Sequence, residues 1–135
     1  MNLATLTVEG EADLLSELID DLRLAVDSRW NKGDQLRTGG THSTSGFCAT
    51  VADTASPGRL LPEIRAFLED YERVLEGKDR TRLSGELGVG ITVGNSDQYI
   101  GSILFGASDM LKLGQLNLTL SVSAYPPSGQ VHAGT

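Results

Sequence analysis

The chain has 135 residues, of which 39% are hydrophobic, and a formal net charge of −7. This length fits one domain, and the apolar content is enough for a buried core, which argues against a disordered chain. The eleven lysines and arginines are scattered, so binding to a nucleic acid backbone is disfavoured. An acidic chain suits a basic partner, although acidity also serves solubility alone.

Three features of the sequence bear on cellular location. Cys48 is the single cysteine, which excludes a disulfide within the chain. The first fifteen residues, MNLATLTVEGEADLL, lack the basic region and apolar run of a signal peptide. No stretch is long and apolar enough to span a bilayer. We therefore expect a cytoplasmic protein in a reducing environment, without contact to a membrane.

The first part of the chain predicts a strand, a helix and two more strands. Residues 3–9 alternate between apolar and polar types, whereas leucines and isoleucine recur at helical spacing in 11–22. Residues 24–30 return to alternation, and 42–52 form the next apolar stretch. Trp30 ends the alternation of its strand, so we expect it to be the last inward residue of a buried face.

The second part predicts two helices and three strands. Residues 59–76 have the strongest helical periodicity of the chain. Residues 85–94 and 98–105 are expected to be strands separated by a turn, with a short helix over 108–113. The clean alternation of 116–125 predicts the last strand.

The order of the first six elements defines the fold class. Strand, helix, strand, strand, helix, strand is the ferredoxin-like βαββαβ pattern. We therefore predict an α+β domain over residues 1–126. A strand, a short helix and a strand extend its core, and two helices pack on one face of the sheet. Residues 127–135 have little to bury and are expected to form a flexible tail.

Two short motifs carry a resemblance to a known family. They are the turn at the end of the predicted third element and the C-terminal helix, glycine and strand, with the residues Trp30, Lys32, Gly33, Asp34, Met110 to Leu116 and Tyr125. Over residues 3–126 the chain resembles the bacterial domain-of-unknown-function family 4279, small cytoplasmic α+β proteins with a Trp-x-Lys-Gly-Asp turn. The family has no assigned reaction. Small proteins of this kind often lie near bacterial toxin genes, so the resemblance suggests an immunity role.

The Trp30 turn is the first candidate site. Gly33 can adopt a positive φ, and Asp34 can accept hydrogen bonds from local amides. Trp30 and Lys32 would then be anchors for a partner, since tryptophan is enriched in binding hot spots. The alternative is that Trp30 closes the edge of the sheet and that the turn is structural.

The second candidate site is an acidic surface on the two longer helices. In a ferredoxin-like fold both helices cover the same face of the sheet, so their outer sides would lie together. The carboxylates expected to bind a basic protein are Glu17, Asp20, Asp21, Glu69 and Glu72. The alternative is a helix surface that is charged only because it is solvated.

Catalytic and cofactor motifs have little support. His42 and Cys48 would lie roughly 20 Å apart along one strand, too far to act as a nucleophile and base. Two histidines and one cysteine give no zinc pattern, and the acidic helix lacks the calcium-loop spacing. The stretch GELGVGITVG lacks the nucleotide-binding glycine patterns. We expect no cofactor and no metal.

These observations predict a non-enzymatic protein-binding module. Its most specific form is a bacterial immunity protein that neutralises a basic toxin through an acidic surface. The alternative is a small-molecule-binding or regulatory domain with a pocket between sheet and helices, and an enzyme is the third choice. Residues 99–125 contain only Asp109 and Lys112 as charges, so an uncovered face there would mark a homodimer or partner surface.

Overall fold

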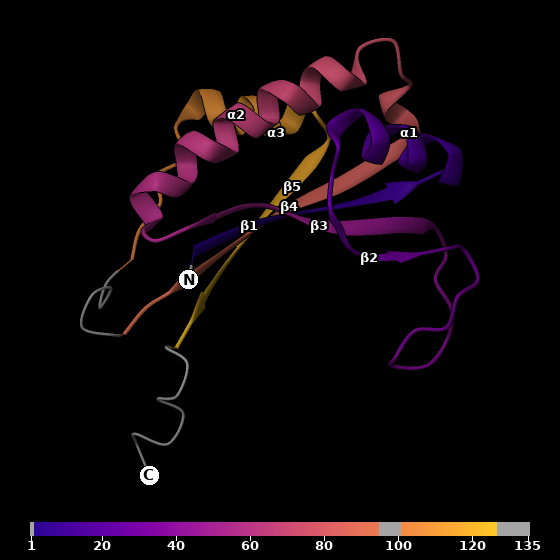
Figure 1. The fold of residues 1–135 in the computed structure, drawn as a ribbon, viewed down its shortest axis with the longest axis horizontal. Coiled ribbons are helices and arrows are strands. Elements are labelled where there is room, and N and C mark those ends of the chain that lie inside the picture. Colours follow the sequence, from indigo (N-terminus) through magenta and orange to yellow (C-terminus); the bar gives the residue numbers. More distant parts are fainter. Residues whose placement is uncertain (1, 95–100, 127–135) are drawn as a thin grey trace.

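The computed structural model describes residues 2–94 and 101–126 as a five-stranded sheet with helices on one face (Figure 1). In chain order its elements are β1 (Asn2–Gly10), α1 (Ala12–Leu22), β2 (Val26–Trp30), β3 (Ser45–Thr54), α2 (Pro57–Leu75), a short 3-10 helix (Arg80–Arg82), β4 (Leu83–Thr92), α3 (Ala107–Gln115) and β5 (Leu118–Tyr125). The strand order β2-β3-β1-β4-β5 contains the ferredoxin-like core. The predicted α+β fold class is therefore confirmed.

Strand β1 lies at the centre of the sheet, and its sequence alternates along its length. Ala4, Leu6 and Val8 are buried against the helices, while the residues between them face the other side. β1 pairs antiparallel with both β3 and β4. The core then forms from these strands and the apolar sides of the helices.

All three helices lie on the same face of the sheet (Figure 1). Leu15 and Leu18 of α1 and Leu60 and Ile64 of α2 are completely buried. α3 joins this layer through Leu113, so the face predicted to carry two helices carries three. None of the helices in the described residues is long and apolar enough to cross a membrane.

The strand predicted over residues 98–105 is wrong where it can be seen. Residues 98–100 lie outside the described residues, and 101–105 form no strand. β4 and β5 are parallel neighbours, so the chain must leave the sheet and return to its starting end through α3. Residues 101–106 belong to this crossover, and Ile103 and Phe105 pack against the core. The predicted tail, 127–135, also lies outside the described residues.

Trp30 lies on the opposite face from the one expected. Val26 pairs with Ala49, but Ser28 pairs with Cys48, so the register shifts at the residue between them. This bulge inserts one residue into the alternation and turns the following side chains to the other face. Trp30 is therefore half-buried on the face that has no helices.

Candidate functional site

The face of the sheet opposite the helices, called the open face from here on, is polar. No helix lies over it in Figure 1. Side chains of β1, β4 and β5 form one half of it, namely Leu3, Thr5, Thr7, Glu9, Ser84, Glu86, Thr119, Ser121, Ser123 and Tyr125. Hydroxyl groups dominate this set, so the open face can form many hydrogen bonds.

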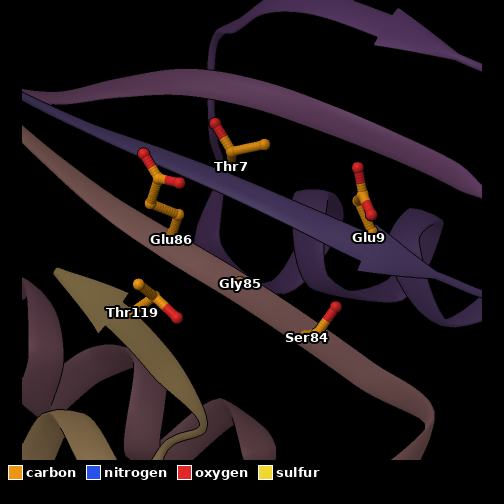
Figure 2. A pocket seen from close by; sticks show the side chains of 6 residues that line it. All are labelled: Thr7, Glu9, Ser84, Gly85, Glu86 and Thr119. Carbon is orange, nitrogen blue, oxygen red and sulfur yellow. The ribbon is translucent and has the colours of Figure 1, made fainter. Parts of the chain in front are cut away.

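Two carboxylates flank a hollow of about 250 Å³ on the open face (Figure 2). Glu86 of β4 lies opposite Thr7 of β1 and Thr119 of β5, and Ser84 lies opposite Glu9. Glu9 and Glu86 are thus diagonal neighbours on adjacent strands, and residue positions related in this way lie about 7–8 Å apart. A Lys or Arg side chain entering the hollow would meet a carboxylate on either side.

No basic side chain of the sheet neutralises these carboxylates. The five strands contain a single basic residue, Arg29, and its guanidinium donates to the hydroxyl of Ser16 on α1, at 2.8 Å on the helix side. Glu9 accepts a hydrogen bond from the Thr44 hydroxyl at 3.2 Å. Over the described ranges Glu86 has no ion pair. Both acids are therefore available to a cation from outside.

The Trp30 turn is built largely by its own hydrogen bonds. The Asp34 carboxylate accepts from the amide of Asn31 at 2.7 Å, and the amide of Lys32 donates to the Ser45 hydroxyl at 2.9 Å. Gly33 has the positive φ expected of it, at 94°. Asp34 therefore holds the turn, whereas Lys32 remains exposed.

Trp30 itself covers a glycine of the neighbouring strand. Its ring lies over Gly46 and stacks on His42, with ring centroids 5.0 Å apart. Tyr125 covers Gly90 in the same way near the other edge of the sheet. Large aromatic rings shield glycines that have no side chain of their own to pack. The rings of Trp30 and Tyr125 therefore lie at opposite edges of the open face.

The acidic helix residues lie on the other layer, and salt bridges neutralise part of them. Asp21 pairs with Lys78 at 3.2 Å. Glu72 pairs with Lys112 at 2.8 Å, and this hydrogen bond lowers the pKa of the Glu72 carboxyl. The exposed members without an ion pair in the described residues are Glu17, Asp20 and Glu69. The structure therefore separates the two predicted sites, because Trp30 and the helices lie on opposite faces.

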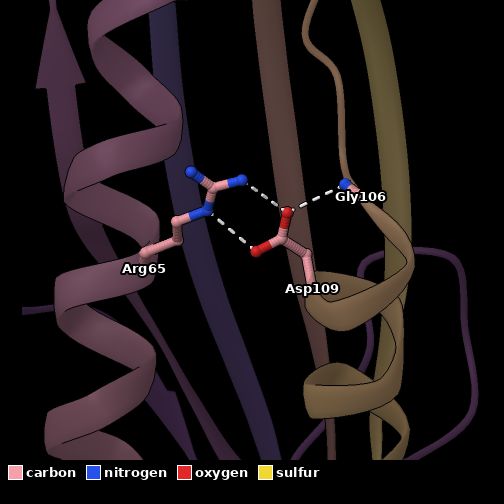
Figure 3. A network of polar contacts seen from close by, with 3 residues as sticks. All are labelled: Arg65, Gly106 and Asp109. Atoms are coloured by element: carbon pink, nitrogen blue, oxygen red, sulfur yellow. Dashed lines mark hydrogen bonds and ion pairs between the residues drawn. The ribbon is translucent and has the colours of Figure 1, made fainter.

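A two-point ion pair between α2 and α3 is a polar contact that the sequence did not indicate (Figure 3). Arg65 donates through Nε and an Nη atom to both oxygens of Asp109, each at 2.8 Å, and the amide of Gly106 donates to the same carboxylate at 2.8 Å. The hydrogen bonds from Arg65 lower the pKa of Asp109, and the hydrogen bond from the Gly106 amide lowers it further. This clamp attaches α3 to α2 and caps the start of α3.

A groove between helices and sheet lies at the β2–β3 edge. Its volume is about 550 Å³. Val51, Phe67 and Val74 form its apolar wall. Its charged residues balance one another and are Asp21, Arg23, Asp70 and Arg73.

The described part of the chain has no candidate metal site. No group of three or more His, Cys, Asp or Glu residues in it could hold a metal ion.

The fold assigns the chain to the α+β proteins with a ferredoxin-like core. No protein-family model, curated protein or solved structure matches it. The resemblance of the Trp30 turn and the C-terminal strand to the bacterial family stays a prediction.

Proposed function

We propose that this chain is a non-enzymatic protein-binding module that holds a basic segment of its partner on the open face. One observation carries the proposal: Glu9 and Glu86 flank a hollow on a sheet whose single basic residue, Arg29, points to the other side. A chain with net charge −7 also attracts basic partners over a distance.

The hydroxyl groups around the hollow complete such a site. Thr7, Ser84 and Thr119 can accept hydrogen bonds from the N–H groups that a guanidinium or ammonium cannot place on the carboxylates. Paired strands hold all of these side chains, so little order has to be created on binding. The open face thus favours a partner that presents Lys or Arg side chains.

An immunity protein that neutralises a basic toxin in the bacterial cytoplasm is the most specific form of this proposal. Toxins that act on nucleic acids carry basic surfaces to bind phosphate, and such a surface suits the two glutamates. Binding would block the toxin sterically and electrostatically, without chemistry. The exposed helix acids, Glu17 and Asp20, would then contribute to long-range attraction more than to contact.

A labelled deca-arginine peptide tests the proposal through two charge-matched variants. Glu9→Gln/Glu86→Gln removes two charges from the open face, and Glu17→Gln/Asp20→Asn removes two from α1. We expect the first variant to bind at least about tenfold more weakly at low salt, roughly 1.4 kcal/mol, and the second to bind nearly as wild type does. Equal losses in both variants, or the larger loss in the α1 variant, would contradict the proposal.

A second candidate function is small-molecule binding in the groove at the β2–β3 edge. Its volume of about 550 Å³ and its apolar wall beside charged residues suit a small amphipathic molecule. The probe is anilinonaphthalene sulfonate. Its fluorescence should rise with the folded protein and fall again in Val51→Trp, which fills the groove. Fluorescence that ignores this substitution would reject the groove as its site.

A further inference from the structure

The outer edge of β5 has main-chain groups that pair with no strand of the described residues, and the proposed function does not use them. The amide of Val93 donates to the carbonyl of Tyr125 at 2.9 Å, and that of Gly85 to the carbonyl of Asn117 at 3.3 Å. Odd-numbered residues of β5 therefore direct their main-chain groups to β4. The N–H and C=O groups of Leu118, Leu120, Val122 and Ala124 point to the outer edge, where no strand of the described residues pairs with them.

The other edge of the sheet is protected, and β5 is not. β2 has five residues, a bulge, and the charges of Asp27 and Arg29. β5 has eight residues, pairs in unbroken register, and contains neither proline nor a charge. Proteins usually shield edge strands with charges, prolines or bulges, because a bare edge pairs with another strand. An unshielded β5 therefore indicates that a strand covers it.

We propose that β5 pairs antiparallel with β5 of a second copy of this chain. The absence of charge along β5 permits a second copy as the occupant. Two copies with a net charge of −7 each repel one another, so contact between them costs least where charges are absent. No charged residue occurs between Leu113 and Tyr125. In a twofold dimer the two paired strands are identical. A charged residue in β5 would therefore lie near the same charge in the second copy.

The outward main-chain groups fix one register. With Ser121 on the twofold axis, Leu118 lies opposite Ala124 of the second copy and Leu120 lies opposite Val122, and each pair exchanges two hydrogen bonds. This register uses every outward residue of the strand. It also covers Val122, which is 53% exposed, with a leucine side chain.

The pairing joins two five-stranded sheets into one continuous sheet. Because the twofold axis is perpendicular to the sheet, both open faces lie on the same side and both helical layers on the other. The dimer does not depend on the proposed function. If that function also holds, the dimer presents two glutamate-flanked hollows to one partner surface.

Disulfide trapping tests the register directly, in a Cys48→Ser background. Ser121→Cys places two thiols across the twofold axis, with Cα atoms about 4.5 Å apart, within the range of a disulfide. Ser123→Cys is the matched control, because its two copies lie about 13 Å apart along the strand. We expect a covalent dimer from the first variant alone. Equal trapping of both, or of neither, overturns the register.

Sedimentation equilibrium tests the dimer without cysteines. Wild type at roughly 100 μM should have twice the monomer mass of 14.4 kDa. Val122→Lys should raise the dissociation constant at least tenfold, whereas Leu111→Lys, at an exposed residue of α3, should leave it unchanged. Circular dichroism confirms that each variant is folded. A wild-type monomer, or equal losses in both variants, overturns the proposal.

Discussion

Gly46→Ala tests whether Trp30 is held against the open face. A Cβ at this position would lie 2.4 Å from Cζ2 and 2.6 Å from Cε2 of the Trp30 ring, and 2.9 Å from the carbonyl oxygen of Val8. Ordinary contacts begin at 3.4 Å, so the ring must move by about 1 Å. The main-chain oxygen of β1 cannot move as easily, so the indole is expected to lift from the sheet.

Overpacking of this kind costs about 1–3 kcal/mol. We expect the lower half of that range, because the indole N–H of Trp30 has no acceptor in the described residues and gains water when it lifts. A loss of about 1–2 kcal/mol should lower the urea midpoint by roughly 1 M. Trp30 is the single tryptophan, so its emission should also shift to the red.

Gly58→Ala is the control for the loss of a glycine. A Cβ there meets nothing within 4 Å, and Gly58 lies in the first turn of α2, so alanine should leave the stability unchanged or raise it slightly. A Gly46→Ala protein that is as stable as wild type, with unchanged emission, would show that the ring does not lie over Gly46.

Three further predictions concern polar groups and glycine contacts. Asp109→Asn should destabilise the protein by about 1 kcal/mol near neutral pH, because the uncharged amide has one oxygen and cannot accept both hydrogen bonds of Arg65. Because folding lowers the pKa of Asp109, its contribution to stability is present above the pKa of the unfolded state and disappears as the pH falls through the folded pKa. The free energies of unfolding of wild type and variant should therefore become equal at acid pH. Burial raises the pKa of Tyr71 to about 12, so wild type should lose stability between about pH 10 and 12, and Tyr71→Phe should remove this loss in alkaline urea melts. Gly90→Ala should move the ring of Tyr125, 2.9 Å from the added carbon, and change the chemical shifts of β4 and β5 without unfolding the protein.

The elements of the fold were largely predictable, because hydrophobic periodicity marks them. Residues 3–9 and 116–125 alternate along their length, and the helix expected over 59–76 is α2 within two residues at either end. The strand expected over 98–105 failed because its apolar residues, such as Ile103, pack in a crossover. Short apolar runs do not distinguish a strand from a packed connection.

The face of Trp30 was not predictable, because it depends on a bulge. Alternation counted along residues 24–30 places Val26 and Trp30 on one face, but one inserted residue at Asp27 reverses the second half. Nothing local in the sequence marks such an insertion. The bulge becomes evident only when β2 is paired with β3.

The two glutamates of the open face were missed for a different reason. Glu9 and Glu86 are far apart in sequence, and each is the only acid in its strand. Strand pairing brings them together. The signal that could have found them is the polar side of each alternating strand. The helix acids, such as Asp20 and Asp21, were predicted as a site because a ferredoxin-like fold places both helices on one face of the sheet, but the fold places a base, Lys78, beside one of them.

Chemical-shift mapping with deca-arginine tests the central claim most directly. If a basic segment binds to the open face, the amide signals of Thr7, Glu9, Glu86 and Thr119 should shift most, and Glu9→Gln/Glu86→Gln should abolish those shifts. Shifts concentrated on α1 that persist in this variant would contradict the claim and place binding on the helical layer.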